Sequence, residues 1–237
     1  MKKINIIILI LIGLSFSISF NGNASDKIIV VTELSPPYQT INDNHIGGFA
    51  TEKVKQYLDS KNINYDIQMY PWARAYKLAS SKTDMMIYGI AKTPKREKIF
   101  DWLIPVYEFK PYLVGLGHRT DLNIRNLEQA KSFTIAVQRN DFSHDYLLEK
   151  GFIENKNIIL TNSIVDSWRL VKNGKVDFIV EDITYVPTIN GEKIELNLFS
   201  KYFPLNDLEA VAYLAVNKSM SKELKSKLFP AVIDKSK

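Results

Sequence analysis

The sequence contains no cysteine and only three histidines among its 237 residues. Without cysteine, the chain has no disulfide, no thiol nucleophile and no cysteine to which a lipid could be attached. The histidines, His45, His118 and His144, lack the spacing of a metal-ligand motif, and we expect them to have solvated or structural roles. The sequence therefore predicts neither a metal site nor a cofactor.

Motifs of phosphate and acyl chemistry are also missing. There is no glycine-rich phosphate loop and no Gly-x-Ser-x-Gly motif, and no acid–base pair stands out. The formal net charge of +5 comes from interspersed basic and acidic residues, a pattern too mild and scattered to favour a nucleic-acid partner. With 46% hydrophobic and 24% charged residues, the chain is expected to form one or two compact lobes.

The first residues, MKKINIIILILIGLSFSISFNGNAS, have the order of a secretory signal peptide. Two lysines precede an apolar run, and small residues precede a cleavage position after Ala24. A membrane anchor is the alternative, but Gly13 and several serines interrupt the run. We therefore expect residues 1–24 to be removed, and the protein to be exported to a bacterial periplasm or an extracellular space.

Short β-branched runs alternate with helical patterns along the rest of the chain. This alternation predicts an α/β fold with mostly parallel sheets flanked by helices. Two such sets occur, one before and one after about residue 114. The expected strands are 27–31, 63–70, 84–88, 133–137, 157–160, 176–180 and 210–216. The expected helices are 48–61, 72–81, 142–150, 163–172 and one from Ser219.

Ligands of open parallel sheets lie beyond the carboxyl ends of the strands, so the loops there are the candidate sites. After the first strand, TELSPPYQT places two prolines before Tyr38, and both Glu33 and Tyr38 are candidates to face a ligand. The alternative is an ordinary strand-exit turn with a packed tyrosine.

The stretch GIAKTPKREKIFDW follows the apolar run DMMIY. Gly89 allows a close backbone approach, and Thr93 is a helix-capping residue before a proline. Arg96 carries a planar fork that matches a carboxylate, so the order favours an anion site at the end of this strand. A capped surface helix with solvated basic residues is the alternative.

Three further segments carry candidates. In QRNDFSHDYL, Asn140, Asp141 and Ser143 are helix-capping types, and this second helix start either points at the same crevice or is a plain helix cap. After the strand FIV, the pair Glu181-Asp182 offers a carboxylate for an ammonium group or for capping. The segment PWARAYKLA is either part of a site or simply an amphipathic helix.

Taken together, these stretches resemble the family 3 extracellular solute-binding proteins, which serve amino-acid ABC transporters. The similarity rests on PPYQTINDNHIGGFATEKV, DMMIYGIAKTPKREKIFDWLIPVYE, FTIAVQRNDFSHDYL and NGKVDFIVED, and it spans roughly residues 27–230. It implies a two-lobe type II periplasmic-binding fold with two crossover strands. On this basis we expect lobe 1 at 25–115 plus 211–237, lobe 2 at 116–210, and crossovers near 112–119 and 205–213.

The resemblance also implies site residues. Arg96 matches the arginine that binds the α-carboxylate of an amino acid, and Asp182 matches the partner of its ammonium group. The first-loop aromatic matches Tyr38, and the backbone contacts match Gly89 and Ala91. Ala91 stands where a serine or threonine hydroxyl is usual.

One position departs from the family pattern. Asn140-Asp141, followed by Phe142, replaces the usual Gly-Thr or Gly-Ser, and an aspartate there would repel a bound carboxylate. The segments TELSPPY and PWARAYKLA resemble a subgroup whose ligands are mostly unassigned, which makes Glu33, Trp72 and Arg74 candidates. The acids Glu33, Asp141 and Asp182, set against Arg96 and Arg74, favour a ligand with more cationic than anionic groups.

The sequence thus predicts a monomeric, non-enzymatic protein that binds a small polar, amino-acid-like ligand and delivers it to an inner-membrane ABC permease. A sensory module that presents its ligand to a membrane receptor is the alternative. An enzyme on the same scaffold is a more distant one.

Overall fold

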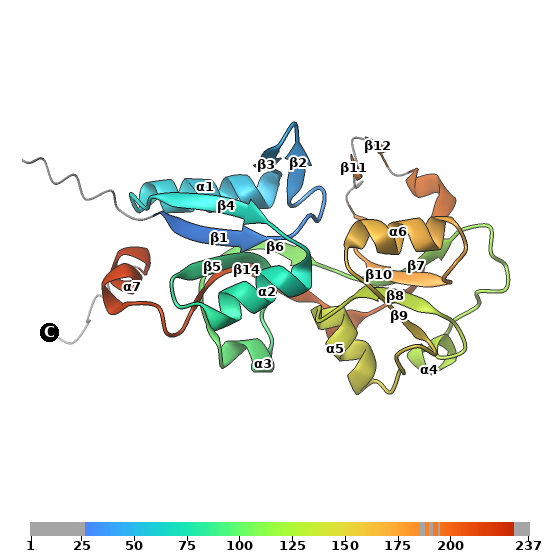
Figure 1. The fold of residues 1–237 in the computed structure, drawn as a ribbon. Coiled ribbons are helices and arrows are strands. Elements are labelled where there is room, and N and C mark those ends of the chain that lie inside the picture. The colour runs from blue at the N-terminus through green and yellow to red at the C-terminus, as the bar shows by residue number, and fades with distance from the viewer. Residues whose placement is uncertain (1–26, 185–187, 190–191, 194, 230–237) are drawn as a thin grey trace, which may run out of the picture.

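The structure is a computed structural model that describes residues 27–184, 188–189, 192–193 and 195–229. The expected signal peptide lies outside the described residues. In the described part the chain forms two lobes side by side, each built on a five-stranded sheet (Figure 1). The predicted two-lobe α/β fold is therefore confirmed.

Lobe 1 has the strand order β4-β1-β5-β14-β6. Its strands are β1 (Ile28–Thr32), β4 (Tyr65–Met69), β5 (Met85–Ala91), β6 (Phe100–Phe109) and β14 (Ala210–Asn217). Its helices are α1 (Phe49–Ser60), α2 (Trp72–Ser81), α3 (Pro94–Glu97) and α7 (Lys222–Leu228), and a small hairpin consists of β2 (Thr40–Asn42) and β3 (His45–Gly47).

The two faces of this sheet are covered by different helices (Figure 1). Because side chains alternate along a strand, neighbouring residues enter different cores. Val30 lies in a core with residues of α1 and α7, whereas Val31 lies in a core with residues of α2. The helix α2 has the bounds that the sequence predicts, since its apolar residues recur at helical spacing and three of them are buried.

Lobe 2 has the strand order β13-β7-β10-β8-β9. Its strands are β7 (Tyr112–Leu116), β8 (Ile135–Gln138), β9 (Ile158–Thr161), β10 (Phe178–Glu181) and β13 (Phe199–Pro204). Its helices are α4 (Leu127–Ala130), α5 (Phe142–Glu149) and α6 (Ile164–Lys172), with short elements β11 (Thr188–Ile189), β12 (Glu192–Lys193), η1 (Leu196–Leu198) and η2 (Asn206–Leu208). Residues of α4 and α5 enter one core with the sheet, and residues of α6 enter another.

Two expectations need correction. Each sheet is mixed rather than mostly parallel, because the strands next to the crossovers, β6 and β14 in lobe 1 and β7 and β13 in lobe 2, pair antiparallel. The first crossover also lies earlier than expected: β7 pairs in the second sheet, so residues 112–115 belong to lobe 2. Only Lys110 and Pro111 separate β6 from β7, and Ala210 already belongs to β14 of lobe 1.

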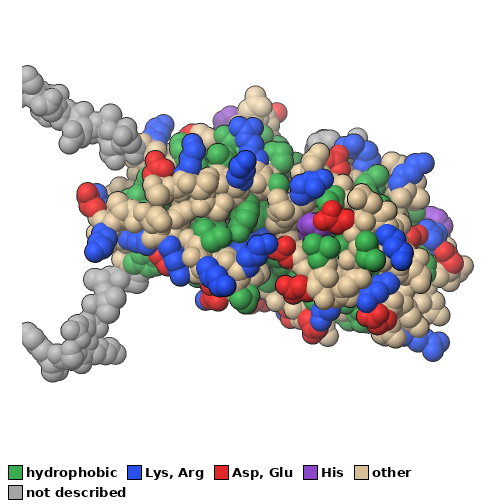
Figure 2. Space-filling view, turned by 60° about the horizontal axis from the view of Figure 1, so that its bottom comes forward, with side chains coloured by type: hydrophobic (Ala, Val, Ile, Leu, Met, Phe, Trp, Pro, Cys, Tyr) green, Lys and Arg blue, Asp and Glu red, His purple; other side chains and the backbone are tan. Residues whose placement is uncertain are grey.

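Charged side chains are spread over both lobes. On the face shown in Figure 2, Lys and Arg are interspersed with Asp and Glu. Among the described residues, no helix combines the length and the apolar character needed to cross a membrane.

Candidate functional site

A cavity of about 50 Å³ lies between the lobes. Both lobes contribute to its wall, through the segments that end β1, β5, β8 and β10, the crossover strands and the start of α6. The lining residues are Glu33, Ser35, Gly89, Ala91, Tyr107, Phe109, Ala210 and Ala212 from lobe 1, and Gln138, Asp141, Phe142, Ser143, Ile164, Val180 and Glu181 from lobe 2. We call this space the interlobe cavity. It has room for roughly four water molecules.

A second, more open hollow of about 230 Å³ shares Glu33 and Gln138 with the interlobe cavity. The amide Nε2 of Gln138 donates to a carboxylate oxygen of Glu33 at 2.6 Å, which joins the two lobes at this point. The Glu33–Gln138 pair therefore stands between the interlobe cavity and the outer hollow.

Three carboxylates face the interlobe cavity: Glu33, Asp141 and Glu181. Burial, followed by the negative charge of Asp141, raises the pKa of Glu33 to about 8. Burial also raises the pKa of Glu181 to about 8, with neighbouring carboxylates adding to the effect. The pKa of Asp141 is raised by burial, although Arg96 and the bonds from Ser143 act in the opposite direction. Ionisation of these carboxyl groups is thus unfavourable in the cavity unless a cation lies beside them.

Arg96 is 2% exposed and lies beside the cavity, on α3. Its guanidinium donates to the carbonyl oxygen of Ala91 at 3.2 Å and to that of Asn140, in lobe 2, at 3.4 Å. The guanidinium carbon lies 5.0 Å from the ring centre of Trp72 and 5.3 Å from that of Tyr76. Arg96 is therefore held between aromatic rings and backbone carbonyls.

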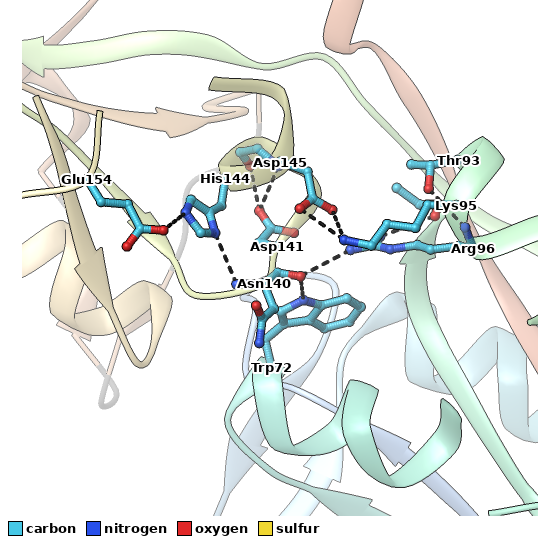
Figure 3. A network of polar contacts seen from close by, with 11 residues as sticks. Trp72, Thr93, Lys95, Arg96, Asn140, Asp141, His144, Asp145 and Glu154 are labelled. Atoms are coloured by element: carbon cyan, nitrogen blue, oxygen red, sulfur yellow. Dashed lines mark hydrogen bonds and ion pairs between the residues drawn. The ribbon is translucent and has the colours of Figure 1, made fainter. Parts of the chain in front are cut away.

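The carbonyl of Asn140 receives a second bond from lobe 1: the indole Nε1 of Trp72 donates to it at 2.8 Å. Asn140 has a φ of 61°, a left-handed conformation that asparagine tolerates better than most residues. Figure 3 shows the Trp72 ring and the Arg96 side chain converging on this carbonyl. We call these three residues the Asn140 clamp.

Polar contacts extend the clamp on the side of lobe 2 (Figure 3). Lys95, next to Arg96, forms an ion pair with Asp145 of α5 at 3.1 Å. The ring of His144 contacts the backbone N–H of Asn140 through Nδ1 and the carboxylate of Glu154 through Nε2. His144 thus has the structural role expected of it.

Both predicted helix starts are present, and each is capped by a side chain. The hydroxyl of Thr93 accepts from the N–H of Arg96 at 3.3 Å, and Asp141 accepts from the N–H and the hydroxyl of Ser143. The carboxylate of Asp141 therefore lies in the cavity wall and also caps α5.

The comparison with known families identifies the type of protein. The family described as "Bacterial extracellular solute-binding proteins, family 3" matches residues 28–151, which is more than half of the chain. The protein belongs to this family. The family-level resemblance seen in the sequence is thus confirmed, and the two lobes have the type II arrangement of periplasmic binding proteins.

Solved structures of amino-acid-binding proteins and of a sensor domain have the same fold. A histidine kinase sensor domain with similarity to periplasmic binding proteins has a TM-score of 0.70 at 19% identity, covering 86% of this chain and 87% of that chain. The substrate-binding protein of an amino-acid ABC transporter has a TM-score of 0.67 at 19% identity, covering 85% and 89%. The arginine-, lysine- and histidine-binding protein ArtJ from Geobacillus stearothermophilus has a TM-score of 0.65 at 19% identity, covering 85% and 86%.

Family 3 proteins bind solutes, and the solved neighbours are binding proteins or a sensor domain rather than enzymes. Among the described residues, no group of His, Asp or Glu has the arrangement of a metal site.

Several candidates from the sequence lie together in this family 3 cleft. Glu33, Gly89, Ala91, Asp141 and Phe142 line the interlobe cavity. Trp72, Thr93 and Arg96 lie beside it, in or next to the Asn140 clamp. Gly89 has a φ of 76°, a conformation that favours glycine, and a Cβ there would lie 2.5 Å from the side-chain nitrogen of Gln39, which would have to move.

Three candidates lie elsewhere. Tyr38 is buried and stacks on the ring of Tyr107, with ring centres 3.9 Å apart, so it supports a lining residue without lining the cavity itself. Asp182 accepts from the backbone N–H groups of Lys110 and Thr184 at 2.9 Å each, and thus anchors the first crossover. Arg74 is exposed and lies 4.3 Å above the ring of Tyr70.

Sequence reasoning missed several residues of the site. It named Glu181 beside Asp182 but chose Asp182, whereas Glu181 lines the cavity. Tyr107 and Phe109 lie in and just after a stretch that was noted only for its family resemblance, and they become lining residues because β6 runs along the cleft. Gln138 directly follows the expected strand at 133–137 and is the last residue of the observed β8, where strand-end reasoning could have found it.

Proposed function

We propose that this protein is a periplasmic solute-binding protein that captures a small polar, amino-acid-like ligand between its two lobes and delivers it to an ABC permease in the inner membrane. The observation that supports this most is the interlobe cavity, which polar groups from both lobes enclose. A ligand in such a place contacts both lobes only when they are closed, so binding energy favours closure.

The hinge in this proposal consists of the two segments that connect the lobes, Lys110–Pro111 and residues 205–209. The N–H of Leu205 donates to the carbonyl of Pro111 at 2.9 Å, which keeps the two segments adjacent. Closure forms the contacts of the Asn140 clamp and of the Glu33–Gln138 pair, since each of them joins one lobe to the other. Opening breaks these few bonds and leaves both lobe cores intact.

A thermal-shift screen of the purified protein over amino acids, polyamines and small carboxylates tests the proposal. A ligand at a hundred times its dissociation constant stabilises the folded state by about 2.7 kcal/mol. We expect the melting temperature to rise by about 5 to 10 °C in a chain of this size. A screen in which no small polar solute raises the melting temperature would contradict the proposal.

Small-angle scattering tests the closure step. Saturating ligand should lower the radius of gyration, because rotation about the two connecting segments brings the lobes together. An unchanged radius with bound ligand would mean that the lobes do not move on binding.

A sensory role is the second candidate. It is favoured by the likeness to a histidine kinase sensor domain, at a TM-score of 0.70. In this role the closed protein presents its ligand to a membrane receptor instead of a permease. Loss of ligand uptake in a deletion strain supports transport, whereas unchanged uptake with loss of a transcriptional response to the ligand supports sensing.

Export is part of the proposal. We expect cleavage after Ala24 and a monomeric, periplasmic product. Mass spectrometry of the periplasmic fraction should find the new N-terminus at Ser25, and light scattering should give the mass of one chain. An intact Met1 on membrane-bound protein would contradict this part.

A further inference from the structure

The wall of the interlobe cavity is acidic. Glu33, Asp141 and Glu181 all line it, and none of the fifteen described lining residues is lysine, arginine or histidine. Among the described residues, no ion pair involves any of the three carboxylates. The closed cavity therefore contains several acids with no cation among its lining side chains.

The partners of these carboxylates are neutral. Glu33 accepts from the amide of Gln138, Glu181 from the backbone N–H of Asp182, and Asp141 from Ser143. Each carboxylate has acceptor capacity left, since a carboxylate has two oxygens with about four lone-pair positions. The cavity wall is thus suited to a donor that carries positive charge.

Arg96 does not fill this role. Its side chain is 2% exposed, it is absent from the cavity lining, and it donates to the carbonyls of Ala91 and Asn140. Because the guanidinium lies outside the lining and donates to two carbonyls of the protein, a carboxylate in the cavity would meet the three acids rather than this guanidinium. Placing a further negative charge among these buried and partly buried acids is costly.

Aromatic side chains form another part of the wall. Tyr107, Phe109 and Phe142 line the cavity, and the rings of Phe109 and Phe142 contact each other across the lobes with centres 5.6 Å apart. Aromatic faces attract cations, most strongly where water is excluded. Together, the carboxylates and the aromatic rings of the wall form an environment that suits an organic ammonium group.

We propose that the ligand of this site is a small organic ammonium compound without a carboxylate, such as a short amine or diamine, rather than a free amino acid. The inference rests on the proposed function, since it concerns the same cavity. The ammonium group lies among Glu33, Asp141 and Glu181, and the aromatic rings enclose the carbon atoms next to it. A longer ligand extends past the Glu33–Gln138 pair into the outer hollow.

Calorimetry with matched pairs of compounds tests the inference at neutral pH. The pairs are ornithine and putrescine, lysine and cadaverine, arginine and agmatine, and glycine betaine and choline. In each pair the first compound carries a carboxylate and the second does not. We expect the tightest ligand to be a carboxylate-free member that binds at least about tenfold more tightly than its partner.

Variants assign the effect to the acids. Glu33→Gln and Glu181→Gln keep the size of each side chain and remove its charge, and each should weaken the tightest amine by about tenfold or more. Glu149→Gln is the matched control, because Glu149 is exposed on α5 and lies outside the cavity lining. It should leave affinity within about twofold.

Two results would overturn the inference, and they differ in what they imply for the function. If an amino acid or a dicarboxylate binds more tightly than every carboxylate-free amine, the cavity accepts a carboxylate and the solute-binding function stands. If neither these pairs nor the wider screen give any binding, the inference and the proposed function fall together.

Discussion

Among the described residues around the interlobe cavity, the buried cation Arg96 and the three acids of the lining have different kinds of partner. Arg96 is enclosed by Trp72, Tyr76 and two backbone carbonyls, one of which belongs to the other lobe. The acids Glu33, Asp141 and Glu181 face the interlobe cavity and have only neutral hydrogen-bond partners. The cation thus joins lobe to lobe, while the acids face the cavity.

This difference follows from the cost of burying charge. A buried ion requires partners, and removal of one partner leaves the other uncompensated. The partners of Arg96 come from the protein itself. The three acids have neutral partners and unused acceptor positions, so a cation beside them would stabilise their charged forms. The comparison leads to four predictions.

The largest effect is expected for Arg96→Ala. The substitution removes two hydrogen bonds, one of which joins the lobes, and the cation that lies against the rings of Trp72 and Tyr76. Calorimetry should show a loss of about 2–5 kcal/mol of binding free energy, or roughly thirtyfold to several-thousandfold in affinity.

Two further variants test this reading of Arg96. Arg96→Lys keeps the charge without the planar fork and should have an intermediate effect. Arg74→Ala is the control, because Arg74 is exposed and outside the cavity lining, and it should change affinity by less than about twofold. If Arg96→Ala binds within a few-fold of the wild type, Arg96 has no part in closure.

Substitutions at the neighbouring acids Glu181 and Asp182 should have smaller effects, one on affinity and the other on stability. Glu181 lines the cavity, whereas Asp182 accepts from the backbone N–H groups of Lys110 and Thr184. Glu181→Gln should weaken binding by about tenfold with little change in melting temperature. Asp182→Ala should lower the free energy of unfolding by about 1–3 kcal/mol with a smaller change in affinity. The reverse pattern would indicate that Asp182 binds the ammonium group of the ligand, as the family resemblance implies.

The acids should also make stability depend on pH. Folding raises the pKa of Glu33 and of Glu181 from 4.5 to about 8. Between these values the unfolded chain releases the protons first, so the free energy of unfolding falls as pH rises from about 4.5 to about 8 and then levels off. A cationic ligand should reduce this loss, because it favours the ionised acids.

Melting curves between pH 5 and pH 8, without ligand, provide the measurement. The wild type should lose at least about 2–4 °C more across this range than the double variant Glu33→Gln with Glu181→Gln, the shift that about 1 kcal/mol produces in a chain of this size. Parallel curves for the two proteins would show that these acids do not titrate between folded and unfolded states.

The smallest effect is expected at the surface of the cleft. Lys95 and Asp145 join the lobes at 3.1 Å, but their side chains are 68% and 35% exposed. Exposed pairs of this kind contribute about 0–1 kcal/mol, so Lys95→Met should change affinity by less than about fivefold. A loss as large as that of Arg96→Ala would place the closure energy at the rim rather than in the Asn140 clamp.

Much of the fold could be predicted from the sequence. Periodicity located α2 at its observed bounds, and the β-branched runs located β1, β5, β8 and β10, because buried faces impose a local pattern. The strand β6 was not predicted, since Pro105 interrupts FDWLIPVYEF. It is an edge strand of its sheet, and proline is tolerated at an edge.

The sequence by itself determined the two α/β sets, the family, the loops that reach the cleft, and some of the residues that line the cavity. The family resemblance favoured Asp182 over its neighbour Glu181. Only the tertiary structure gives their different positions: β10 pairs antiparallel with β7, where Glu181 stands opposite Tyr112 and lines the cavity, while Asp182 accepts bonds at the crossover.

The same holds for Arg96. Its charge and its position after a capping threonine can be read from the sequence, but its partner Asn140 lies 44 residues away, in the other lobe. Local patterns reflect which side of an element is buried, and they carry no information on which carbonyl of another lobe an arginine will reach. The docking of the two lobes settled that the cation is used inside the protein and that the acids face the cavity.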